Sequence, residues 1–225
     1  MRRRLERHHL PIALGSAVGL ALTYLLVRSP NAVHRWSMAT AYVGLALLGA
    51  TLVTGPLNIL RGRPNPVSTD VRRDLGIWAG VLSIVHFLVG WQVHMKHRYL
   101  YFFRDVEGSH ALLPRTDLFG FANYTGLAAV LIALLLLAIS NDYFLRILGS
   151  DRWKRLQRWN YALFGLVILH GVAFQVIEER KLPFVIVLSV LVVASVLLQL
   201  EGFRRRRAAR QRSATLAAQF DDVTA

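Results

Sequence analysis

Six apolar segments of about 20 residues each occupy most of this 225-residue chain and restrict its fold more than any other feature. About 20 apolar residues in α-helical form cross a bilayer, and a helix satisfies all its backbone hydrogen bonds within one segment. The sequence therefore predicts an all-α polytopic membrane protein, a bundle of six transmembrane helices. In chain order the segments are Leu10 to Val27, Trp36 to Leu60, Asp74 to Val93, Phe121 to Ile139, Gln157 to Ile177, and Leu182 to Leu200.

The composition agrees with this class of protein. The chain is 54% hydrophobic with a mean hydropathy of +0.40, and its charged residues gather at the edges of the apolar segments. We expect one integral domain over residues 10–203 between two cytoplasmic tails, residues 1–9 and a basic tail at 204–225 that is poorly ordered. No appended catalytic module is expected.

The distribution of positive charge predicts the orientation. Of the 27 Lys and Arg residues, 19 lie in the two tails and the loops after the second and fourth segments, and 8 lie on the opposite side. Short cytoplasmic loops carry the excess of Lys and Arg in membrane proteins. Both termini should therefore be cytoplasmic, and we expect the inner membrane of a bacterial cell. The net charge of +14 then indicates contact with anionic lipid rather than with nucleic acid.

The chain contains no cysteine. This absence excludes disulfides, iron–sulfur clusters with thiolate ligands and covalently attached c-type haem. Histidine is left as the main candidate ligand for a transition metal.

Two histidines, His86 and His170, lie deep inside apolar segments. Each is about a dozen residues from the start of its segment, or roughly 18 to 20 Å along a helix axis. The third and fifth segments run in the same direction, so both imidazoles should lie at the same depth. Ionisable groups at that depth are costly and mark functional sites. The alternative is a neutral histidine bonded to a neighbouring carbonyl.

Axial ligation of one haem b is the chemistry that best fits this pair. A zinc site needs three or four ligands, and no carboxylate or cysteine lies nearby in these two segments. With both axial positions occupied, haem iron transfers electrons rather than binding oxygen. We therefore expect one haem b between His86 and His170.

Two stretches carry a resemblance to a known family. Arg72-Arg-Asp-Leu-Gly76, ten residues before His86, and Leu148 to Tyr161, which leads to Leu169-His170, resemble the ferric reductase-like transmembrane domain family. Within it the chain is most similar to the MsrQ (YedZ) haem-binding membrane subunits of periplasmic methionine-sulfoxide reductase systems. The resemblance implies six spans, b-type haem, a cytosolic flavin reductase as electron donor, a flavin cofactor and an outer-face molybdoenzyme as acceptor.

The chain departs from the family pattern at the positions 13 residues before the two histidines. Larger relatives carry a second histidine pair there and hold two haems, whereas this chain has Arg73 and Gln157. The departure favours a single haem. A flavin (FMN) or a quinone bound near Arg73, Arg155 and Arg158 would bridge the remaining distance to the cytoplasm. Ordinary positive-inside anchoring is the simpler explanation for these arginines.

The other histidines are weaker candidates. His94 and His97 lie at the outer end of the third segment and are possible ligands of a second, outer haem or a metal, opposite Ile177 and Glu178. His34 and His110 are expected to be solvated in outer loops. The stretch Arg98 to Arg104 is predicted to lie in the membrane interface.

Three functions stay open at this point. The first is transfer of electrons by haem b, as a subunit of an oxidoreductase system, from a cytosolic flavin reductase or quinone to an outer-face redox protein. The second is a non-redox membrane protein, a small transporter or an assembly subunit, although transporters place more polar groups in mid-span. The third is a stand-alone ferric reductase-type membrane component.

Overall fold

A computed structural model describes residues 4–62, 67–106 and 111–224 of the chain. Among these residues the structure has six helices long and apolar enough to cross a membrane. The prediction of an all-α integral membrane protein with six spans is confirmed. The elements are η1 (Leu5–His9), α2 (Leu10–Leu26), α3 (Ala32–Leu60), α4 (Val67–Gly90), η2 (Arg98–Tyr101), β1 (Phe103–Asp105), β2 (Leu112–Pro114), α5 (Leu118–Ala138), α6 (Asp142–Gln157), α7 (Trp159–Ile177) and α8 (Leu182–Thr224).

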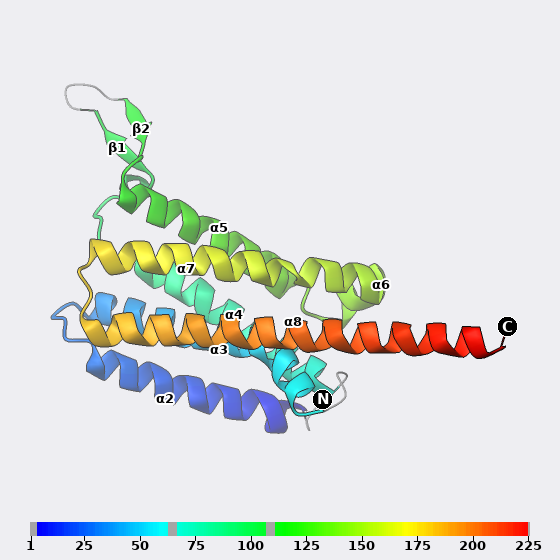
Figure 1. The fold of residues 1–225 in the computed structure, drawn as a ribbon. Helices are drawn as coiled ribbons and strands as arrows, with labels where there is room; N and C mark the ends of the chain where they lie inside the picture. The colour runs from blue at the N-terminus through cyan, green and yellow to red at the C-terminus, as the bar shows by residue number, and fades with distance from the viewer. Residues whose placement is uncertain (1–3, 63–66, 107–110, 225) are drawn as a thin grey trace.

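The spanning helices run alternately up and down, so α4 and α7 point the same way (Figure 1). The start of η1 and the free end of α8 lie at one end of the bundle, called here the terminal end. The β1–β2 hairpin lies at the opposite end, the hairpin end. Because α4 and α7 run in the same direction, His86 and His170 can lie at the same depth in the bundle.

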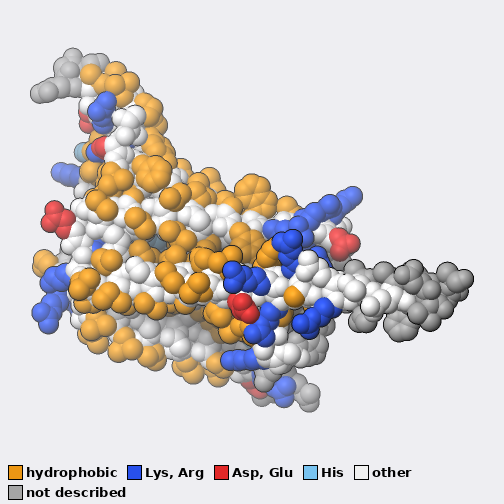
Figure 2. Space-filling model, in the orientation of Figure 1, with side chains coloured by type: hydrophobic (Ala, Val, Ile, Leu, Met, Phe, Trp, Pro, Cys, Tyr) orange, Lys and Arg blue, Asp and Glu red, His pale blue; other side chains and the backbone are white. Residues whose placement is uncertain are grey.

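Helix α3 lies at the centre of the bundle and packs against α2, α4 and α8, while α7 packs mainly against α5. Its contact with α8 is close because Gly202 faces Pro56, where an added Cβ would lie 2.8 Å from the proline Cβ. The core includes Leu48 and Leu52 of α3 and Ala133 of α5. Large apolar side chains cover the outer surfaces of the helices, as expected for contact with lipid (Figure 2).

Polar caps fix where three of the helices begin. Asn31 accepts hydrogen bonds from the backbone N–H groups of Val33 and His34 at the start of α3. Asp117 caps α5 through Gly120, and Asn141 caps α6 through Phe144. Such side chains satisfy the N–H groups that a helix start leaves unpaired. The cap at Asn31 places His34 in a helix and not in the solvated loop that the sequence predicted.

The end of the chain differs from expectation. The tail after Arg204 was expected to be poorly ordered, but α8 continues through it to Thr224 and projects beyond the bundle (Figure 1). Ala, Arg and Gln are abundant there and all favour helix. The stretch after His97 is a 3₁₀ turn followed by an antiparallel hairpin in which Arg104 pairs with Leu113. His110 and residues 1–3 lie outside the described residues.

Candidate functional site

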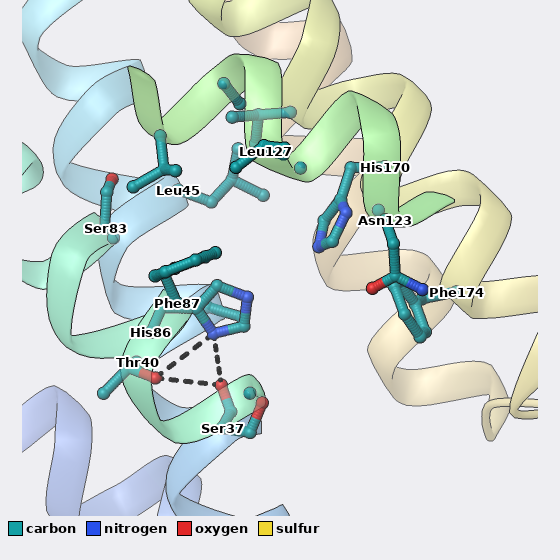
Figure 3. A pocket seen from close by; sticks show the side chains of 18 of the residues that line it. Ser37, Thr40, Leu45, Ser83, His86, Phe87, Asn123, Leu127, His170 and Phe174 are labelled. Atoms are coloured by element: carbon teal, nitrogen blue, oxygen red, sulfur yellow. Dashed lines mark hydrogen bonds between the residues drawn. The ribbon is translucent and has the colours of Figure 1, made fainter. Parts of the chain in front are cut away.

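The two predicted ligands, His86 of α4 and His170 of α7, line one cavity and lie next to each other. Their ring centres are 6.0 Å apart and their planes are nearly perpendicular, at 82°. Figure 3 shows both imidazoles pointing into the same space between the helices. The structure therefore brings together the two residues that the sequence selected from matched depth alone.

Each imidazole is held by a backbone carbonyl at Nδ1. His86 Nδ1 lies 3.0 Å from the carbonyl oxygen of Ser37, and His170 Nδ1 lies 2.8 Å from that of Ala122. A carbonyl oxygen only accepts hydrogen bonds, so Nδ1 must carry the proton in both rings. A neutral ring then presents the lone pair of Nε2, which is the arrangement found in metal-binding histidines.

The ring spacing fits a single metal ion between the two histidines. Metal–imidazole nitrogen bonds are roughly 2 Å long, so an ion bound by both Nε2 atoms would hold the ring centres roughly 6 Å apart. The observed 6.0 Å agrees with that requirement.

Small residues make room beside both rings. A Cβ added at Gly126 of α5 would lie 2.6 Å from His170 Nδ1, so only glycine allows the ring to rest on that helix. Gly90, one turn after His86 on α4, would place a Cβ 3.4 Å from Ser37 Oγ. Farther toward the terminal end the cavity wall is apolar and includes Leu45, Leu48 and Leu163. An apolar wall with few polar groups is typical of a ligand-binding cavity.

The hairpin end of the cavity is polar. Glu178, at the end of α7, accepts hydrogen bonds or ion pairs from His94 Nε2 at 3.0 Å, His34 Nε2 at 3.3 Å and Arg180 Nε at 2.9 Å. Burial alone would raise the pKa of the Glu178 carboxyl, but these three partners outweigh it and hold that pKa below its ordinary range. His94 therefore faces Glu178, as its position in the sequence predicted. His34, which was expected in solvent, also contacts Glu178. His97 instead stacks on Tyr99 with ring centres 5.9 Å apart.

The three arginines of the predicted flavin or quinone site, Arg73, Arg155 and Arg158, differ in their surroundings. Arg73 donates to the carbonyl oxygen of Ser140 at 2.9 Å and pairs with Asp142 at 2.6 Å. Arg155 and Arg158 are exposed near the junction of α6 and α7. Figure 2 shows basic side chains gathered over this end of the molecule. The start of α4, which carries Arg73, and the α6–α7 junction, which carries Arg155 and Arg158, lie at the same end of the bundle (Figure 1).

A buried carboxylate that the sequence analysis passed over lies at the terminal end of α4. The side chain of Asp74 is 0% exposed and binds Arg4 at 2.5 Å, His8 at 2.9 Å and His9 at 3.4 Å. These contacts fasten the N-terminal segment to α4. An acidic residue in the first turns of an apolar segment, combined with a basic N-terminal tail, was the available signal.

Comparison with known proteins adds no assignment. No family of known proteins matches this chain, and no solved structure matches it significantly. The functional reading therefore rests on the residues of the cavity.

Proposed function

We propose that this protein is a haem b-binding transmembrane electron-transfer protein, in which His86 and His170 are the axial ligands of one haem. The observation that carries this proposal is the pair of imidazoles 6.0 Å apart, each with Nδ1 bonded to a backbone carbonyl. Two ligands at matched depth in an apolar cavity suit haem iron better than zinc, which takes more protein ligands.

The chain's own residues supply ligation, orientation and a dry environment. The carbonyls of Ser37 and Ala122 fix the tautomer and the rotation of the two rings. Gly126 lets the ring of His170 rest against α5. When bound, the haem supplies one-electron redox chemistry, and the protein tunes its potential through these contacts and through low polarity.

The direction of transfer follows from topology and charge. We place the terminal end in the cytoplasm of a bacterial cell, since 19 of the 27 Lys and Arg residues belong to the segments that meet there. Electrons then pass from a cytosolic flavin reductase or a quinone to a redox protein on the outer face. Membership of the ferric reductase-like transmembrane family, close to MsrQ, is part of this proposal, and FMN is its second candidate cofactor.

An optical spectrum tests the proposal. Protein purified in detergent should show a b-type band in its reduced-minus-oxidised spectrum, and either His86→Ala or His170→Ala should remove it because one axial ligand is lost. His97→Ala is the matched control, since His97 is exposed and stacks on Tyr99 outside the cavity. A full band in the double alanine variant would refute the assignment, as would its absence from haem-replete wild-type protein.

A further inference from the structure

The helices that carry the two histidines form three matched layers toward the hairpin end. His86, Gly90 and His94 follow one another at four-residue spacing on or just after α4, and His170, Phe174 and Glu178 do so at the end of α7. The first and third members of the two series face each other: the ring centres of His86 and His170 are 6.0 Å apart, and His94 Nε2 lies 3.0 Å from the Glu178 carboxylate.

The cavity spans all three layers and changes character along its length. Phe174 lies between the two histidines, with its ring centre 4.9 Å from that of His170 and 5.5 Å from that of His94. Beyond it the wall becomes polar and includes Tyr42, Tyr101, Gln175, Glu178 and Arg180. The side-chain oxygen of Gln175 is buried there without a hydrogen-bond partner in the structure. The hairpin end of the cavity thus offers hydrogen-bonding groups, and the terminal end offers almost none.

Arg180 is the one permanently positive side chain among the described residues of the cavity wall. Its side chain is 14% exposed, its Nε atom lies 2.9 Å from Glu178, and it also interacts with the Tyr42 hydroxyl. Glu178 also has His94 and His34 as hydrogen-bond partners, so the guanidinium is not the only group that contacts this carboxylate. A guanidinium carries five N–H donors, and this one therefore keeps donors for another anion.

A haem carries two propionate carboxylates on one edge of the macrocycle. An ionised carboxylate buried among leucine side chains without a partner is strongly disfavoured. Of the two ends of the cavity, only the hairpin end supplies a cation. Charge-assisted bonds from a guanidinium to a carboxylate are short, strong and well oriented.

We propose that Arg180 binds haem propionate and thereby orients the macrocycle with its carboxylate edge toward the hairpin end. Glu178 acts as a positioning residue, because it holds the guanidinium at the cavity wall. This inference rests on the proposed function, since it concerns the same haem. It adds the part of the site that distinguishes haem from a tetrapyrrole without free carboxylates.

Binding titrations with two ligands test the inference. Full-length apo-protein in detergent is titrated with haem and, separately, with the dimethyl ester of haem, in which both carboxylates are masked. Arg180→Gln should bind haem about tenfold more weakly than wild type, the loss expected for one charge-assisted contact, and should bind the diester within twofold of wild type. Comparing variants with the same ligand cancels the partition of each ligand into micelles.

Two further variants keep the test decisive. Lys181→Gln removes a neighbouring exposed charge and should change neither affinity, whereas Arg180→Lys should keep part of the preference for haem. An unchanged haem affinity in Arg180→Gln, or an equal loss for both ligands, would overturn the role of Arg180. Failure of the proposed function gives a different result: neither ligand would then bind wild-type protein in a way that His86→Ala and His170→Ala abolish.

Discussion

The same two membrane spans, α4 and the span formed by α6 and α7, carry pairs of residues at two levels, and the two pairs make different contacts. At the level toward the hairpin end, His86 and His170 turn toward each other across a cavity. Thirteen residues earlier, Arg73 and Gln157 both turn to Ser140, which follows α5: Arg73 bonds its carbonyl oxygen at 2.9 Å and Gln157 its hydroxyl at 3.4 Å. Residues at the same depth on neighbouring spans can therefore bind a shared ligand. Whether they do so, or make structural contacts instead, depends on the residue types at that depth.

This contrast supports one haem in place of two. In the family pattern the second pair of ligands lies at the level of Arg73 and Gln157, where these side chains contact Ser140 and Asp142, between α5 and α6 and at the start of α6. The terminal end of α4 is further occupied by Asp74 and its partners from the N-terminal segment. The terminal half of the bundle is thus held together by polar contacts, and the hairpin half is arranged around a cavity.

The largest loss of stability in this comparison is expected at Asp74. Replacing it by Leu removes the acceptor for Arg4, His8 and His9 and leaves these groups beside an apolar side chain. Breaking a buried ion pair on one side costs about 3 to 5 kcal/mol, and the 31% exposure of Arg4 favours the lower end of that range. Thermal unfolding followed by circular dichroism in detergent measures the loss. Asp70→Leu, one turn earlier at an exposed position, is the control, and an equal loss there would refute the special role of Asp74.

Replacing Gly126 by Ala should lower the free energy of unfolding by about 1 to 3 kcal/mol, because the neighbouring groups must shift to make room for the added methyl group. The new methyl group would meet His170 Nδ1 at 2.6 Å, so the hydrogen bond to Ala122 is also disturbed. Haem content per folded protein should fall with it, as measured by the pyridine haemochrome absorbance. Gly165→Ala on α7 has open space around the added Cβ and should leave haem content unchanged. Full haem occupancy in Gly126→Ala would contradict the proposed packing.

Removing the contacts of Arg73 and Gln157 with Ser140 tests whether their level affects stability alone or also cofactor binding. The double change Arg73→Gln with Gln157→Ala should lower the free energy of unfolding by about 1 kcal/mol, since the lost hydrogen bonds are few and Asp142 is 70% exposed. Haem content and the b-type spectrum should stay as in wild type. Loss of a second spectral component in this variant would show that the level of Arg73 and Gln157 holds a cofactor after all.

The sequence was sufficient for the number of spans, their directions and the pairing of His86 with His170, because hydrophobic length and helical rise fix depth. It was insufficient for several other contacts between side chains of distant segments. His34 was expected in solvent, yet its helix cap and the end of α7 bring it to Glu178. The union of Asp74 with the N-terminal segment and the shared use of Ser140 by Arg73 and Gln157 depend likewise on how helices rotate about their axes, which hydropathy does not determine.

The smallest effect is expected from Glu178 and appears as a change in acid stability. Its partners His34, His94 and Arg180 hold the pKa of the carboxyl below its value in the unfolded chain. A group with a lowered folded-state pKa adds stability above its unfolded pKa of about 4.3, and that contribution is lost as the pH falls through the folded-state value. The melting temperature of wild-type protein should therefore fall more steeply between about pH 5 and pH 3 than that of Glu178→Gln, which has no carboxyl to protonate.

Glu179→Gln, at the exposed neighbouring position, should follow the wild-type profile. Identical slopes for Glu178→Gln and wild type would show that the cluster at the hairpin end contributes nothing to folding as an ion pair, and Arg180 would then owe its place to Tyr42 and the α7–α8 turn.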